Sequence, residues 1–115
     1  MKKLSFPKSK RIISNRQFKD ILANGRCVRD NLLNLYIAPN NCGYPRLGIS
    51  IGKSSGNAVE RNRIKRLLRE AFRQNQDKIP AGWDYVILLS NRAKQQNLTY
   101  EQVSSSFLAL VAAAL

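Results

Sequence analysis

Apolar residues recur at helical spacing through the middle of the chain, between residues 57 and 73. At about 100° of rotation per residue, the apolar positions share one side of a helix: Ile64, Leu67, Leu68, Ala71 and Phe72. No proline or glycine interrupts this segment, and Asn57 is suited to the N-cap position at its start. The pattern therefore predicts a long amphipathic helix with one face packed on a core.

Two shorter helices are predicted near the ends of the chain. The first begins at Ser14 and ends at Asn24-Gly25, a pair typical of a left-handed helix end. The second follows Thr99, which forms the sequence pattern of a capping box with Gln102. We expect each of these helices to pack its apolar stripe against the same core as the central helix.

Alternation of apolar and polar residues predicts strands over residues 26–29, 32–38 and 46–52, whereas 83–89 is an almost continuous apolar run typical of a buried strand. A clear turn at 39–43 predicts that the two longer alternating strands pair as an antiparallel hairpin. Strand, long helix and strand in succession indicate a crossover unit within one sheet. The second face of the hairpin carries small residues and is open enough for a flat ligand.

Composition adds a strong charge to this α/β pattern. The 115 residues suit one domain, over 1–115, and 20 Lys+Arg against 7 Asp+Glu give a net charge of +13. Such a balance indicates a nucleic acid or an anionic membrane surface as partner. The apolar run at 107–115 is far short of the roughly 20 residues that span a bilayer. With no signal-peptide pattern, we expect a cytoplasmic protein without a membrane partner.

The first twelve residues are basic and aperiodic. We interpret them as a basic N-terminal arm that docks on the domain or is ordered by a partner, and the alternative is a disordered solubilising tail.

The same composition argues against chemistry performed by the chain itself. Histidine is absent, which removes the usual general base and the commonest metal ligand. The seven carboxylates are scattered singly, and two cysteines are too few and too far apart for a zinc site of familiar spacing. We expect no catalytic residue and no metal ligand in this chain.

Cations gather along the central helix, most of them on the flank beside its apolar stripe, with Arg63 roughly opposite the stripe. The segment holds six within thirteen residues: Arg61, Arg63, Lys65, Arg66, Arg69 and Arg73. A solvated face usually mixes both signs, whereas only two carboxylates fall here. Arginine suits bidentate phosphate contacts, and Asn62 could read a base edge or orient an arginine. Residues and spacing alone therefore predict a module that binds RNA or DNA.

The run Arg46-Leu47-Gly48-Ile49-Ser50-Ile51-Gly52-Lys53, continued from Gly56 to Phe72, resembles the protein subunit of bacterial ribonuclease P. The Arg-Asn-Arg block at 61–63, followed by Lys-Arg and Arg, is that family's signature. The resemblance extends to the basic start at 8–12, to the strand entry at 80–86 and to Leu98-Thr99-Tyr100.

The resemblance implies an α+β fold, αβββαβα, a single-domain two-layer sandwich with a mixed four-stranded sheet. It also implies a left-handed βαβ crossover, close to one domain of a small-subunit ribosomal protein. The usual rule for parallel strands would have predicted a right-handed crossover.

The resemblance also implies a ribonucleoprotein endoribonuclease whose catalytic centre lies on its RNA. The partners expected are the catalytic ribonuclease P RNA and precursor tRNA, with no obligate protein partner. The RNA uses Mg²⁺, bound mainly by the RNA and the substrate, to remove the 5′ leader and give the mature tRNA 5′ end. The protein holds the leader and strengthens the binding of substrate and metal.

Matching positions carry two sets of site residues over from the family. The expected RNA-binding residues are Arg61, Asn62, Arg63, Lys65, Arg66 and Arg69, with Lys53 near the entry of the helix. The expected leader cleft holds Phe18, Leu22, Asn34 and Tyr36, between the first helix and the open sheet face. Leu22 stands where some members have a second aromatic residue.

Three other functions remain as alternatives. A ribosomal or RNA-chaperone protein of the same fold would bind RNA without assisting cleavage. A DNA-binding regulator would use the same charge, and a free-standing nuclease would need a hydrolytic constellation that the sequence does not offer.

Overall fold

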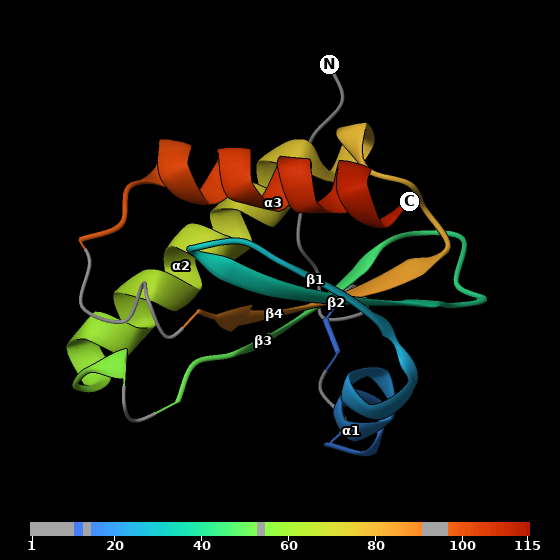
Figure 1. Cartoon of the computed structure of the whole chain (residues 1–115), viewed down its shortest axis with the longest axis horizontal. Helices are drawn as coiled ribbons and strands as arrows, with labels where there is room; N and C mark the ends of the chain where they lie inside the picture. The colour runs from blue at the N-terminus through green and yellow to red at the C-terminus, as the bar shows by residue number, and fades with distance from the viewer. Residues whose placement is uncertain (1–10, 13–14, 53–54, 91–96) are drawn as a thin grey trace.

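The computed structural model describes residues 11–12, 15–52, 55–90 and 97–115. A mixed four-stranded sheet lies at its centre, with helices on both faces (Figure 1). The strands are β1 (Arg26–Arg29), β2 (Leu33–Pro39), β3 (Arg46–Ser50) and β4 (Trp83–Leu89). The helices are α1 (Asn15–Asn24), α2 (Ala58–Asn75) and α3 (Tyr100–Ala114), and the short 3-10 helix η3 (Gln76–Lys78) follows α2.

The strand order in the sheet is β1-β2-β4-β3, which corrects the hairpin prediction. The segments 32–38 and 46–52 do not pair, because β4 lies between them, antiparallel to β2 and parallel to β3. The turn at 39–43 reverses the chain without deciding which strand becomes the neighbour. Four consecutive residues in the middle of β4 are buried, so this strand takes the central position and β3 remains at an edge.

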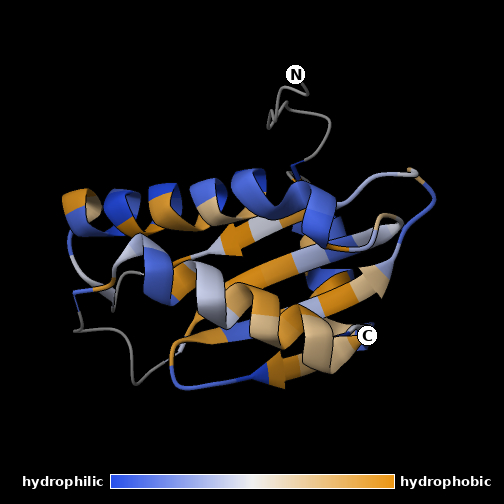
Figure 2. Ribbon diagram, turned by 90° about the horizontal axis from the view of Figure 1, so that it is seen from above, coloured by the Kyte–Doolittle hydropathy of each residue, from blue (hydrophilic) through white to orange (hydrophobic). Residues whose placement is uncertain are grey.

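The crossover prediction is confirmed, since α2 connects the parallel neighbours β3 and β4. The helices α2 and α3 pack together over one face of the sheet and enclose the main core (Figure 1). The largest fully buried side chains there include Tyr85, Phe72 and Phe107, and the Phe107 ring contacts the other two rings. Figure 2 shows the difference between these helices, with hydrophilic turns along α2 and a mostly apolar α3.

Two predicted helix caps are present. The Asn57 side chain accepts a hydrogen bond from the Glu60 N–H and the Glu60 side chain accepts one from the Asn57 N–H, a full capping box. Thr99 and Gln102 form the second capping box, at the start of α3. Ser14 and the N-terminal arm up to residue 10 lie outside the described residues.

The end of α1 corrects another prediction, because neither Asn24 nor Gly25 has a positive φ angle. Gly25 is required for a different reason. A Cβ at this position would lie 2.5 Å from the Ile21 carbonyl oxygen and 2.7 Å from that of Ile37. The absent side chain therefore lets the chain pass directly from α1 into β1 beside β2.

On the sheet face opposite α2 and α3, α1 packs over a second, smaller apolar cluster. Its buried members are Ile12, Ile21 and Val86. The Ile12 N–H donates a 2.8 Å hydrogen bond to the Leu47 carbonyl at the β3 edge. This face is only partly covered, because α1 is 10 residues long.

Candidate RNA-binding surfaces

The predicted cations of α2 do not all have the same surroundings. Asn62, Arg66 and Arg69 are exposed, whereas Arg61 and Lys65 are half-buried on the flank nearer the apolar stripe. Within the ranges that the structure describes, Arg66 and Arg69 make no ion pair. The outer surface of α2 therefore presents cations whose charge is not neutralised by the protein.

Two other arginines of α2 have partners within the protein. Arg63 Nη2 donates a 2.6 Å hydrogen bond to the Leu98 carbonyl, just before α3. Arg73 forms an ion pair with Glu70, and Gln74 also donates to that carboxylate. The hydrogen bonds from Arg73 and then Gln74 lower the pKa of Glu70, although burial opposes them. Arg73 is therefore less available to a phosphate than Arg66 is.

Arg61 differs from its neighbours at its Nε atom. This atom is shielded from solvent and has no hydrogen-bond partner among the described residues. A buried donor without a partner costs about 1–3 kcal/mol, so an incoming acceptor that reached it would recover that energy. Lys53, which was expected at the entry of the helix, lies outside the described residues.

The strand register shows which side chains share the open face of the sheet. Residues opposite one another across paired strands point to the same face. One row across the sheet consists of Arg29, Asn34, Leu88 and Ser50. The next row consists of Cys27, Tyr36, Val86 and Gly48. The helix α1 lies over the second row, and the first row borders it.

All four predicted cleft residues lie on this side of the molecule. Phe18, Leu22, Asn34 and Tyr36 are half-buried, and three of them pack against the smaller apolar cluster. Asn34 is adjacent to them through the register of β2. The structure thus brings Phe18 and Leu22 of α1 together with Tyr36 of β2, and Asn34 follows on the same face of that strand.

Gly48 explains how Phe18 reaches the sheet. A Cβ at Gly48 would lie 2.7 Å from Phe18 Cε2 and 3.2 Å from the Ile12 Cβ atom. The ring therefore rests directly on the backbone of β3, where any side chain would push it away. This contact gives a physical reason for glycine in the Arg-Leu-Gly-Ile-Ser-Ile run.

The side chain of Tyr36 is held by its neighbour on β1. Contact with Cys27 is the main cause of a raised pKa for the Tyr36 hydroxyl, and burial acts in the same direction. The phenol therefore stays neutral at physiological pH. A neutral ring with a hydroxyl suits stacking and hydrogen bonding with a nucleotide base.

Arg29 is a candidate residue that the sequence patterns did not identify. It is exposed, it shares a row with Asn34, and its Nη2 atom lies 3.9 Å from Cys27 Sγ. Only the pairing of β1 with β2 brings this cation beside Asn34, one of the predicted cleft residues. The available signal was weak: in a strand over 26–29, Cys27 and Arg29 share a face.

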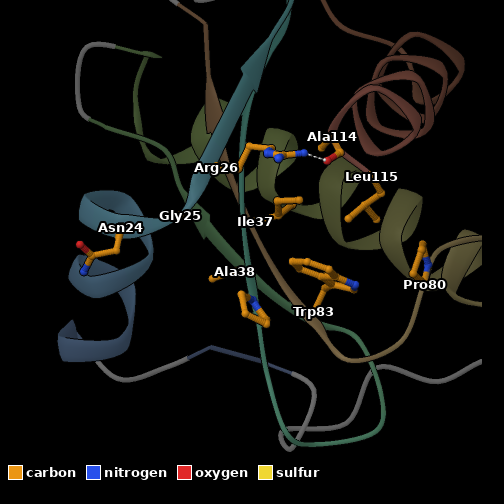
Figure 3. A pocket seen from close by; sticks show the side chains of 10 residues that line it. Asn24, Gly25, Arg26, Ile37, Ala38, Pro80, Trp83, Ala114 and Leu115 are labelled. Atoms are coloured by element: carbon orange, nitrogen blue, oxygen red, sulfur yellow. Dashed lines mark hydrogen bonds between the residues drawn. The ribbon is translucent and has the colours of Figure 1, made fainter.

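A separate hollow of about 560 Å³ lies at the far end of the sheet (Figure 3). Trp83 and Ile37 point into it from β4 and β2, and Leu115 borders it after α3. Arg26 Nη1 donates a 2.6 Å hydrogen bond to the Ala114 carbonyl at its rim. Because this bond satisfies the end of α3, we assign Arg26 to the fold and not to a binding surface.

The carboxylates with close partners serve the fold as well. Asp84, which is buried, accepts bonds from Arg46 at 2.8 and 2.6 Å and from Asn40 at 2.7 Å. The hydrogen bond to Asp84 is the main cause of a raised pKa for Arg46. Across the four described ranges, no group of three or more His, Cys, Asp or Glu side chains could hold a metal ion.

The model of the Ribonuclease P family matches residues 6–114 of the chain. A Ribonuclease P protein component of Clostridium botulinum (strain Loch Maree / Type A3) is 35% identical over 105 residues, which cover 90% of this chain and 93% of that protein. One from Syntrophus aciditrophicus (strain SB) is 43% identical over 88 residues, covering 76% and 74%.

Solved structures agree with these sequence relatives. The RNase P protein from Thermotoga maritima has a TM-score of 0.82 and 29% identity, and the alignment covers 88% of this chain and 94% of that one. The Staphylococcus aureus RNase P protein has a TM-score of 0.80 and 34% identity, with coverage of 93% and 96%. The order and packing of the helices and strands are therefore those of known proteins.

Proposed function

The chain belongs to the Ribonuclease P family of protein components, and we propose that it holds the catalytic RNA on α2 and the 5′ leader of precursor tRNA in the cleft beneath α1. Ribonuclease P is an endoribonuclease made of RNA and protein, with catalysis by the RNA. The protein's contribution is therefore binding and positioning. The observation that carries the proposal is the presence of two distinct surfaces, one cationic and one partly apolar, on opposite sides of the sheet.

The RNA-docking part of the proposal rests on the exposed face of α2. Asn62, Arg66 and Arg69 are exposed there, and Arg61 and Lys65 flank them. Arg63 is tied to the Leu98 carbonyl through Nη2 and still has other guanidinium donors. Neutralisation of several phosphates releases counterions, so binding would weaken steeply with salt.

The leader part rests on Phe18, Leu22, Asn34 and Tyr36. A single strand without regular pairing exposes its bases, and a neutral phenol beside a half-buried phenyl ring offers a stacking surface. The Asn34 amide can donate and accept hydrogen bonds with a base edge. Leu22 supplies an apolar contact in place of a second ring.

We assign Mg²⁺ mainly to the RNA and the substrate. The described residues gather no set of carboxylates suited to hold it. When bound, the ion would activate water and stabilise charge on the scissile phosphodiester. The side chains of this protein hold the leader and neutralise RNA phosphates around that centre.

The proposal is tested by adding the protein to its cognate RNA and leader-bearing precursor tRNA at limiting Mg²⁺. We expect the protein to increase correct cleavage at the mature 5′ end. No increase would refute assistance to the RNA enzyme, and cleavage without added RNA would indicate a free-standing nuclease. An RNA chaperone of the same fold would bind the RNA and leave cleavage unchanged.

Two variants test whether α2 binds the catalytic RNA and whether the cleft binds the leader. Arg66→Ala should weaken binding of the catalytic RNA and reduce the slope of log K against log salt by about 1. Tyr36→Ala should reduce the preference for leader-bearing over mature tRNA and leave binding of the catalytic RNA unchanged. Equal losses for precursor and mature tRNA would argue against a leader cleft.

A further inference from the structure

A groove of about 780 Å³ runs along the outer side of α2 and ends against the start of α3. Its apolar lining comes from Val59, Leu67 and Tyr100. Val59 is 75% exposed, the largest exposure among the described large hydrophobic residues, and Leu67 and Tyr100 are half-buried. An exposed aliphatic side chain in the first turn of a cationic helix does not serve phosphate binding.

Cations border this apolar strip. Arg66 and Arg69 line the groove and are exposed, whereas Arg63 and Arg73 are held by the Leu98 carbonyl and by Glu70. The bonds of Arg63 and Arg73 hold those two side chains in the wall of the groove. The guanidinium groups of Arg66 and Arg69 remain available to a ligand. Glu70, the one carboxylate of the lining, is already neutralised by Arg73.

We propose that this groove takes an unpaired nucleotide of the catalytic RNA, with its base on Tyr100 and Leu67 and its flanking phosphates on Arg66 and Arg69. Val59 covers the edge of the base or of its neighbour. The inference rests on the proposed function, since it requires RNA docked on α2. It adds a subsite that selects an unstacked base, which a row of phosphate contacts alone would not do.

Charge complementarity favours RNA over a protein as occupant. An apolar peptide segment would fit the strip but would leave Arg66 and Arg69 desolvated without partners, which is costly. A nucleotide satisfies both parts, because its base is planar and apolar on its faces and its phosphates are anionic. The groove also lies on the same helix as the proposed docking surface.

The test compares RNA complexes of the wild-type protein with those of Tyr100→Leu and Val59→Ser. The affinity at several salt concentrations is measured for each complex. Reactivity of the RNA bases is measured with dimethyl sulfate, which reports on A and C, and with a carbodiimide, which reports on G and U. Val59→Ser guards against misfolding, because that side chain is largely solvated already. Tyr100→Phe keeps the ring, and Leu115→Ser is a matched control that removes a 45% exposed apolar side chain at the opposite end of α3.

We expect at least one unpaired base to be protected by the wild-type protein, by Tyr100→Phe and by Leu115→Ser. That base should regain reactivity with Tyr100→Leu and Val59→Ser. Affinity should fall about tenfold for Tyr100→Leu, with the salt slope unchanged, since stacking releases no counterions. Arg66→Ala should change the slope instead.

Two results would overturn the inference. Unchanged base reactivity in both groove variants would show that no base enters the groove, as expected if it served an acidic peptide. If these variants reduced the salt slope and changed the reactivity of no base, the groove would contact only RNA phosphates. Failure of the proposed function is a separate result, because the wild-type protein would then not raise cleavage by the RNA.

Discussion

At the scale of single residues, the contact between Phe18 and Gly48 links the family-like sequence run to the open sheet face. The aromatic ring is placed by the absence of a side chain on β3, where a Cβ would approach Phe18 Cε2 to 2.7 Å. Since the Phe18 ring is part of the proposed leader cleft, a substitution at Gly48 in β3 should weaken binding of the substrate.

Gly48→Ala should displace the Phe18 ring and lower stability by about 1 kcal/mol, because the crowded atoms belong to a side chain that can move at the cost of packing. Urea unfolding and the preference for leader-bearing tRNA are the measurements. Combining Gly48→Ala with Phe18→Leu should cost less than the sum of the single changes. Full additivity would show that the two residues do not touch.

Asp30 is a second residue with a particular role, at the turn between β1 and β2. Its Oδ1 accepts from the Leu32 and Leu33 N–H groups at 2.8 and 2.9 Å, and Ser106 of α3 donates to its Oδ2. Burial alone would raise its pKa, but the hydrogen bonds from Ser106, Leu33 and Leu32 outweigh it and lower the pKa. The folded state therefore favours the ionised carboxylate.

Asp30→Asn should reduce stability at neutral pH by about 0.5–1 kcal/mol, a small value because Asp30 is largely exposed. Because its folded pKa is below the unfolded value near 3.9, this stability is present above that value and is lost as pH falls through the folded pKa. The wild-type advantage should shrink in acid urea titrations. Asp77→Asn, at an exposed position of η3, is the control, and an equal pH effect there would refute the assignment.

Among the elements, the sheet register decides which side chains border the proposed leader cleft. Pairing of β1 with β2 aligns Arg29 with Asn34, and pairing of β2 with β4 adds Leu88 to the same row. The short edge strand thus contributes a cation to a surface that otherwise comes from α1 and β2. If the leader binds there as proposed, this guanidinium would be placed to contact one of its phosphates.

Arg29→Ala should raise KM for leader-bearing precursor tRNA about threefold to tenfold, as expected for one lost phosphate contact of about 1 kcal/mol. Affinity for the catalytic RNA should not change. Lys78→Ala removes the same charge from the exposed end of η3 and serves as the control. If both variants have the same effect, Arg29 acts only through the net charge.

At the scale of the whole molecule, the sheet separates the two proposed binding surfaces. The helices α2 and α3 cover one face, and α1 covers part of the other (Figure 1). The net charge of +13 favours association with RNA in general, while the two surfaces determine which part of it binds where. None of the described helices is long and apolar enough to cross a membrane.

Because the surfaces share no side chains, Arg66→Ala and Tyr36→Ala should act independently. The fold-loss in precursor affinity of the double variant should equal the product of the fold-losses of the two single variants, within about twofold. Competition with mature tRNA, which lacks the leader, separates the contribution of the leader to affinity from the contribution of RNA docking. A strong departure from the product would mean that RNA docking reshapes the cleft.

Local periodicity and capping chemistry in the sequence are enough to predict the helices, the strands and the cationic face of α2. Asn57 and Thr99 begin their helices as predicted. Through the Arg-Asn-Arg block the sequence also indicated the family, which the comparisons confirm. The individual RNA-binding and cleft residues remain predictions for the variants above to test.

The neighbours of each strand and the partners of each charge become known only in the folded chain. Placement of β4 between β2 and β3 depends on which strand can be buried on both faces, a property of the assembled sheet. The ties of Arg63 to Leu98 and of Arg46 to Asp84 join residues 35 and 38 positions apart. No local pattern specifies such contacts, since they arise when the packed core brings distant segments together.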